Sequence, residues 1–227
     1  MPMDKTVFCL LAGALVGIGC KYSVCFLARR LLKNRGLDYV ESQTMRLWLT
    51  VIMAAFGAAI GIFVPLSAET VFLFLLLVIL GTLSVTDILH RRIPNDMLVA
   101  LLTMTLALGI PGLFGVSGFH PFTVKGALIG LAAMFIVFTL PGLLKKNVGA
   151  GDIKLAACIG FSLGLSRSLL CVVVMGVLVL AFSLLQNRMP VLKFAKEMIP
   201  MGPFIGIAAM AVAIASGAGM LNDMFVI

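Results

Sequence analysis

Long stretches of apolar residues recur along the whole 227-residue chain. A helix needs about 20 such residues to cross the hydrocarbon core of a bilayer. Hydrophobic residues make up 62% of the chain and charged residues only 11%, whereas a soluble domain has about 25% charged residues. A soluble fold of this length could not bury so much apolar side chain. The sequence therefore predicts an all-α, polytopic transmembrane helical bundle and argues against an ordinary cytosolic enzyme.

We expect one integral-membrane domain over residues 1–227, with eight spans. The sixth span is short and the break after it, at residues 166–168, is brief. The alternative is a chain with seven spans, or with a bent hairpin at this point. In chain order the spans are 6–28, 47–66, 70–89, 97–114, 123–144, 153–165, 169–185 and 203–220.

Lysine and arginine are concentrated in alternate connections between these spans. The first, third, fifth and seventh connections hold most of them, whereas the other side of the membrane holds Lys5, Lys125 and Arg167. Basic loops remain in the cytoplasm, so this side is expected to be cytoplasmic. The net charge of +8 is explained by these flanking charges and by contact with membrane lipid. No aromatic–basic interleaving indicates a nucleic-acid partner.

The five cysteines all lie in apolar segments, and the sequence contains no CxxC pair. We interpret them as small buried hydrophobic residues. A zinc site is therefore not predicted, and we expect neither a metal nor a cofactor.

Two acidic residues, Asp87 and Asp152, stand out because acidic side chains in or beside a span are costly. Asp87 lies near the end of the third span and Asp152 opens the sixth. Two spans separate them, so both carboxylates are expected at the same membrane face. Each also has a structural interpretation alone: Asp152 as a helix N-cap, and Asp87 as an ion-pair partner of Arg91 one turn later.

Two carboxylates at one face can share a proton, because close like charges do not both ionise easily. The ionised carboxylate can take a proton from water, and the protonated one can polarise a carbonyl or protonate a leaving amine. Gly149 and Gly151, which precede Asp152, allow close approach of the backbone and positive φ angles. Lys154 is interpreted either as reaching the lipid headgroups or as contacting substrate or the acidic pair.

Three motifs carry a resemblance to a known family. Residues 148–155, VGAGDIKL, resemble the GxGD motif of type IV prepilin leader peptidases, and residues 86–95, TDILHRRIPN, resemble that family's first aspartate motif, which ends in Ile-Pro-Asn. Residues 199–204, IPMGPF, resemble its late Ile-Pro-Phe-Gly-Pro-Phe motif, with Met201 in place of Phe. From the first to the last, the motifs span residues 86–204, which is more than half of the chain, and they occur in the family's order.

The resemblance implies a GxGD intramembrane aspartic protease of a bacterial inner membrane, with its active site facing the cytoplasm. Asp87 and Asp152 would be its catalytic pair. Its partner would be a type IV prepilin or pseudopilin, whose basic leader is cut just before an apolar helix. Other residues of the motifs would shape the site, namely Pro94, Asn95, Gly149, Gly151, Lys154, Pro200, Gly202 and Pro203.

The connection at residues 29–46 differs from many members of that family. Those members carry a cytoplasmic domain here, with two CxxC pairs and an N-methyltransferase activity. This chain has only a short basic loop without a cysteine pair. The resemblance therefore implies the short, peptidase-only type.

Two further functions compete with the peptidase. A proton-coupled secondary transporter can also use an intramembrane aspartate beside a helix broken by glycines, although such sites lie near the bilayer midplane and no inverted repeat is evident. A non-catalytic membrane protein of pilus or secretion assembly would tolerate the loss of either aspartate.

Overall fold

A computed structural model describes residues 3–114, 122–143, 149–188 and 200–221. This part of the chain forms eight helices and no strand, which confirms the prediction of an all-α polytopic bundle. The helices are α1 (Met3–Lys33), α2 (Gln43–Phe63), α3 (Ala68–His90), α4 (Asn95–Leu113), α5 (Val124–Leu143), α6 (Ala150–Leu163), α7 (Leu165–Arg188) and α8 (Gly202–Gly217).

Six of these helices, α1 to α5 and α7, are long and apolar enough to cross a membrane, and α8 is a shorter apolar helix. The 14 residues of α6 rise about 21 Å, which is less than the hydrocarbon thickness of about 30 Å. This agrees with the prediction that the sixth span is short.

The connections differ from the sequence prediction in two places. Helix α1 continues to Lys33, because Arg and Lys are good helix formers that extend a span into the polar region. The first connection is therefore a loop of residues 34–42 rather than 29–46. The break between α6 and α7 falls at Gly164, whose φ of 77° favours glycine, so residues 166–168 lie inside α7 instead.

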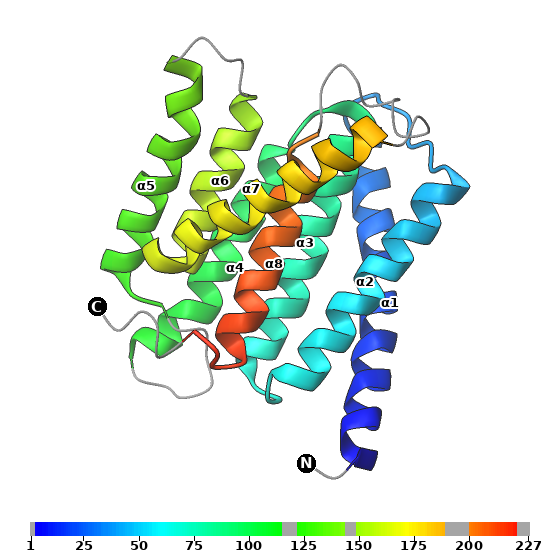
Figure 1. Ribbon diagram of the computed structural model, residues 1–227, viewed down its shortest axis with the longest axis vertical. Helices are drawn as coiled ribbons and strands as arrows, with labels where there is room; N and C mark the ends of the chain where they lie inside the picture. Colours follow the sequence, from blue (N-terminus) through cyan, green and yellow to red (C-terminus); the bar gives the residue numbers. More distant parts are fainter. Residues whose placement is uncertain (1–2, 115–121, 144–148, 189–199, 222–227) are drawn as a thin grey trace.

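Helix α3 is the centre of the bundle. It packs against α1, α2, α4 and α8, and Figure 1 shows α1 and α2 on one side of it and α5 and α6 on the other, with α7 crossing obliquely. The core runs along it through side chains such as Phe72, Leu76 and Leu83, which are almost completely buried.

Two hairpins are held together by glycines at their helix crossings. Gly13 and Gly17 of α1 face Gly57 and Gly61 of α2, and a Cβ at Gly13 would collide with the carbonyl oxygen of Gly57. These two GxxxG pairs allow close contact between backbones, as in many membrane helix pairs.

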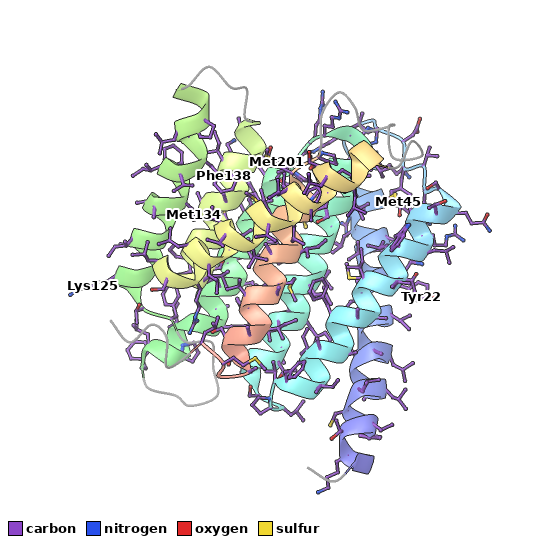
Figure 2. The ribbon with its side chains drawn as sticks, in the orientation of Figure 1. Tyr22, Met45, Lys125, Met134, Phe138 and Met201 are labelled. Atoms are coloured by element: carbon purple, nitrogen blue, oxygen red, sulfur yellow. The ribbon has the colours of Figure 1, made fainter. Side chains whose placement is uncertain are left out.

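The second hairpin, α5–α6, is built in the same way. A Cβ on Gly130 of α5 or on Gly160 of α6 would collide with the carbonyl oxygen of the other residue. Met134 and Phe138 of α5 are buried beside this crossing, as the side chains in Figure 2 show. Each hairpin is therefore a closely packed unit on one flank of α3.

Candidate active site

Asp87 lies in the last turn of α3 and is 6% exposed. Helix α3 ends at His90 because the next residue, Arg91, adopts the left-handed conformation, with φ 52° and ψ 38°. The Arg91 N–H donates to the carbonyl oxygen of Asp87 over 2.8 Å. Among the described residues Arg91 alone has a positive φ without being glycine, and such strain is often found at functional sites.

Asp152 lies in the first turn of α6, where its own N–H donates to the carbonyl oxygen of Gly149 over 3.0 Å. The N-cap of α6 is Gly149, so the interpretation of Asp152 as an N-cap is wrong. Gly149 has a φ of −62°, so this glycine does not serve to reach a positive φ.

Both motif glycines instead provide space. A Cβ on Gly149 would lie 2.8 Å from Oδ2 of Asp152, and a Cβ on Gly151 would lie 3.1 Å from Cβ of Ile93. The first glycine gives room to the Asp152 carboxylate. The second lets α6 approach the segment that follows α3.

Asp87 and Asp152 line the same cavity of about 310 Å³. Their helices do not pack against each other in the described part of the chain. Both α4 and α8 contact α3 and α6, and these two helices hold the carboxylates in place. The expectation from span counting, that the two acids lie at one end of the bundle, therefore agrees with the structure.

Four cationic side chains surround this acidic pair. The cavity lining includes Arg35 from the first loop, Arg91 and Arg92 from the end of α3, and the exposed Lys154 of α6. Coulombic attraction to Arg91 favours the charged form of Asp87. No local signal in the sequence places Arg35, a residue of the first connection, at the cavity.

The third motif reaches the site through its backbone. Gly202, the first residue of α8, donates its N–H to Oδ2 of Asp87 over 2.9 Å. This N–H has no partner within its own helix, and the helix N-terminus favours an anion. Pro203 follows inside the first turn. The close approach requires glycine, because a Cβ on Gly202 would lie 2.8 Å from the same oxygen.

The remaining motif residues mark helix boundaries beside the cavity. Pro94 is buried and is the N-cap of α4, and Asn95 begins that helix and lines the cavity. Pro200 lies just before α8. Lys145, Lys146, Lys193 and Lys196, which contributed to the predicted orientation, lie outside the described residues.

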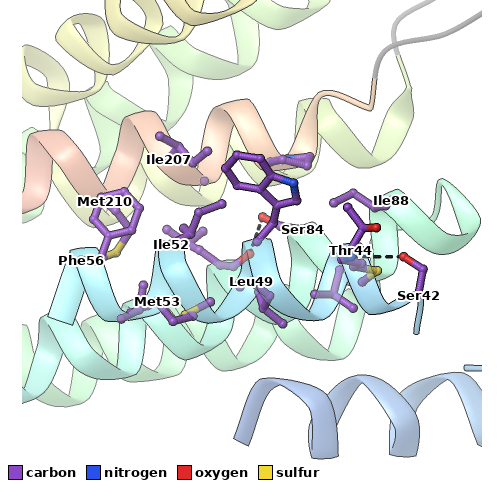
Figure 3. Close-up of a pocket in the computed structure, with 18 residues that line it drawn as sticks. Ser42, Thr44, Leu49, Ile52, Met53, Phe56, Ser84, Ile88, Ile207 and Met210 are labelled. Carbon is purple, nitrogen blue, oxygen red and sulfur yellow. Dashed lines mark hydrogen bonds between the residues drawn. The ribbon is translucent and has the colours of Figure 1, made fainter. Parts of the chain in front are cut away.

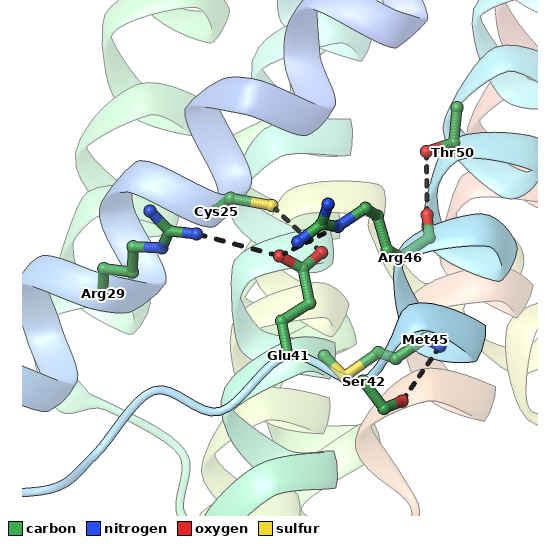
Figure 4. A network of polar contacts seen from close by, with 7 residues as sticks. All are labelled: Cys25, Arg29, Glu41, Ser42, Met45, Arg46 and Thr50. Atoms are coloured by element: carbon green, nitrogen blue, oxygen red, sulfur yellow. Dashed lines mark hydrogen bonds and ion pairs between the residues drawn. The ribbon is translucent and has the colours of Figure 1, made fainter.

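The loop of residues 34–42 is anchored at several points near the cavity. Glu41 pairs with Arg29 of α1 at 3.8 Å and with Arg46 of α2 at 3.7 Å, and the Cys25 thiol lies 3.9 Å from it (Figure 4). The carbonyl oxygen of Asp38 lies 2.8 Å from Nε2 of His90, three residues after Asp87. The loop, which contributes Arg35 to the cavity lining, is therefore tied to α1, α2 and α3.

One carboxylate oxygen of the pair has no partner. Oδ1 of Asp152 is buried and accepts no hydrogen bond from the described residues. A buried polar atom without a partner costs about 1–3 kcal/mol. Asp152 itself lines the cavity, and burial of this oxygen without a partner favours the neutral, protonated carboxyl group there.

The fold and this site together define a polytopic helical membrane protein with a paired-aspartate cavity at one end of its bundle. A model of the type IV leader peptidase family matches residues 71–184, a range that contains both aspartates. The chain belongs to this family.

A prepilin leader peptidase/N-methyltransferase of Bacillus subtilis (strain 168) is 31% identical over 158 residues. The match covers 68% of this chain and 58% of that protein, so the chain spans less than two thirds of its relative. No solved structure matches the chain.

Proposed function

We propose that this chain is an intramembrane aspartic endopeptidase that removes the basic leader of type IV prepilins or pseudopilins at the cytoplasmic face of a bacterial inner membrane. The observation that carries the proposal is the single cavity lined by Asp87 of α3 and Asp152 of α6. Membership of the type IV leader peptidase family supports it independently.

The proposed reaction uses water as the nucleophile. The ionised carboxylate takes a proton from water while the water oxygen attacks the scissile carbonyl carbon. The protonated carboxylate first polarises that carbonyl and then gives its proton to the leaving amine as the C–N bond breaks. The pair ends with one proton, as it began.

The surroundings of the two aspartates support different tasks. The Gly202 N–H fixes the carboxylate of Asp87, and hydrogen bonds to a charged carboxylate stabilise that charge. Asp152 has a buried oxygen without a hydrogen-bond partner among the described residues, which favours the protonated form of its carboxyl group. We therefore assign Asp87 as the base toward water and Asp152 as the acid toward the peptide.

The cations around the cavity are consistent with the cytoplasmic orientation, since positive residues are retained on that side. Because Arg35, Arg91, Arg92 and Lys154 line the cavity, a basic leader is expected to remain outside it. The peptide bond then enters at the boundary between the charged mouth and the apolar bundle.

We do not extend methyl transfer to this chain. The name of the Bacillus subtilis relative includes an N-methyltransferase, but here a short loop of residues 34–42 joins α1 and α2. The peptidase-only assignment predicts that a cleaved substrate retains an unmodified N-terminal amine, which mass spectrometry can check.

The deciding experiment is co-expression with a prepilin-like substrate, followed by immunoblotting for leader removal. Asp87→Asn and Asp152→Asn are each expected to reduce cleavage by more than about 100-fold, because each removes a proton-transfer group. The matched control is Asp38→Asn, since Asp38 lies in the nearby loop and contacts His90 only through its carbonyl oxygen. Cleavage retained by either single variant contradicts the paired mechanism.

A further inference from the structure

A second hollow lies beside the acidic pair, between α2, α3 and α8. It is an apolar groove of about 610 Å³. Figure 3 shows Ile52 and Phe56 of α2 facing Ile207 and Met210 of α8 across it. We call it the stem groove. The residues that line it include Trp48, Ile52, Gly81, Ile88, Pro203 and Ile207.

The groove exists because α2 is held elsewhere. Its glycines Gly57 and Gly61 fix it against α1 with backbone contacts. On its other face α2 presents large side chains, including Trp48, which is 64% exposed. These large side chains, with those of α3 and α8, line the open space, although α2 also contacts both helices.

One end of the stem groove lies beside the candidate active site. Ile88 lines the groove and directly follows Asp87, and Pro203 lines it and directly follows Gly202, the residue that binds Asp87. The first turn of α8 and the last turn of α3 therefore separate the groove from the acidic pair. From Ile88 the groove extends along α3 to Leu77, a distance of about 17 Å for that part of a helix.

The chemistry of the lining matches an apolar helix. Its hydroxyl groups are those of Ser42, Thr44 and Ser84, and the Ser84 hydroxyl donates to the carbonyl oxygen of Leu80 over 2.7 Å. Beyond these the lining is apolar. A helix with satisfied backbone groups can lie in such a groove, with its side chains as anchors at helical spacing.

We propose that the stem groove holds the apolar helix of the substrate, the segment that directly follows the cut site. This inference rests on the proposed function, and the geometry provides its main support: one end of the groove is lined by Ile88 and Pro203, which are next to Asp87 and Gly202 in the chain. The groove thus positions the peptide bond, because the bound stem fixes the distance between its first turn and the carboxylates.

The test compares two substrates and two pairs of variants. One substrate has its complete apolar stem, and the other ends shortly after the cut site. Ile52→Trp and Ile207→Trp fill the groove, whereas Val173→Trp and Val177→Trp alter an α7 face on which both valines are 62% exposed. The groove variants are expected to reduce cleavage of the complete substrate about tenfold, because remote binding contributes to the rate, and to leave the stemless substrate unchanged.

Several results would overturn the inference. Groove variants that cleave the complete substrate at the wild-type rate, or that lose both substrates equally, show that the groove does not hold the stem. Wild-type protein that cleaves neither substrate overturns the proposed function itself. Thermal melting in detergent confirms that each variant is folded.

A second measurement is needed if neither the wild-type protein nor any variant cleaves the substrate that lacks the apolar stem. A photo-reactive phenylalanine analogue is placed at Ile52 or Ile207 in the Asp152→Asn background, with Val173 as the control position. Adducts with the substrate stem are expected from the two groove positions and not from the control. Adducts with lipid alone contradict the inference.

Discussion

The backbone N–H of Gly202 donates to Oδ2 of Asp87 over 2.9 Å, and 115 residues of chain separate the two. The bond joins the beginning of α8 to the last turn of α3. It satisfies one of the N–H groups that a helix N-terminus leaves unpaired. Helix α8 is thereby part of the candidate active site as well as of the packed core.

Gly202→Ala should disturb this relationship directly. A Cβ at this position would lie 2.8 Å from Oδ2 and 3.0 Å from Cβ of Asp87, so the carboxylate has to move. We expect leader cleavage to fall about 100-fold, since displacements near 1 Å have effects of this order. The control is Gly176→Ala in α7, where a Cβ meets no atom within 4 Å. Equal cleavage rates for the two variants would contradict a positioning role.

Two glycines in α1, Gly17 and Gly19, should respond in opposite directions to alanine. A Cβ on Gly17 would collide with the carbonyl oxygen of Met53, whereas a Cβ on Gly19 meets nothing within 4 Å. Gly17→Ala is expected to destabilise the protein by about 1–3 kcal/mol through overpacking. Gly19→Ala is expected to stabilise it by about 0.5–1 kcal/mol. Unfolding in mixed detergent measures the change in stability of each variant. Changes of the same sign and size would contradict the close α1–α2 crossing at Gly17.

Glu41→Gln should loosen the loop of residues 34–42. The Glu41 side chain is 6% exposed, but its partners Arg29 and Arg46 are more than half exposed, so the loss is expected to be only about 1 kcal/mol. Asp96→Asn is the comparison, since the Asp96 side chain is 71% exposed where Glu41 is 6% exposed, and it should have a smaller effect. Melting at low and high salt checks this, because screening should reduce the difference.

Thr105 of α4 and Ser162 of α6 share a buried hydrogen bond of 2.7 Å, which helps to hold the helix that carries Asp152. Each hydroxyl also lies within hydrogen-bond distance of a carbonyl oxygen in its own helix, that of Leu101 or of Cys158. Removing one partner is therefore expected to cost only about 0.5–1.5 kcal/mol, the usual net contribution of one hydrogen bond. A double-mutant cycle with Thr105→Val and Ser162→Ala measures the coupling. Additive effects of the two changes would show that the bond contributes nothing to stability.

Apolar segments and span counting predicted the helices and placed Asp87 and Asp152 at the same end of the bundle, because a chain in lipid must satisfy its backbone groups within helices that run from face to face. The ends of helices were less predictable. The continuation of α1 to Lys33 and the break at Gly164 depend on local backbone conformation, and hydrophobicity does not report it.

Contacts between segments far apart in the chain were also not predicted from the sequence. The bond from Gly202 to Asp87 and the position of Arg35 at the cavity join distant segments. No spacing in the sequence specifies them. The stem groove was also not predicted, since an α2 residue beside lipid and one beside a groove have the same apolar character.

The order of the helices has a consequence for biosynthesis. Asp87 and Asp152 are both translated before the ribosome reaches Gly202, so a nascent chain contains the two carboxylates before it contains the amide that fixes one of them. The glycine-packed hairpins α1–α2 and α5–α6 can assemble in the bilayer during this time. The site therefore cannot be completed until α8 has left the ribosome, so the activity proposed above is expected only after α8 has joined the bundle.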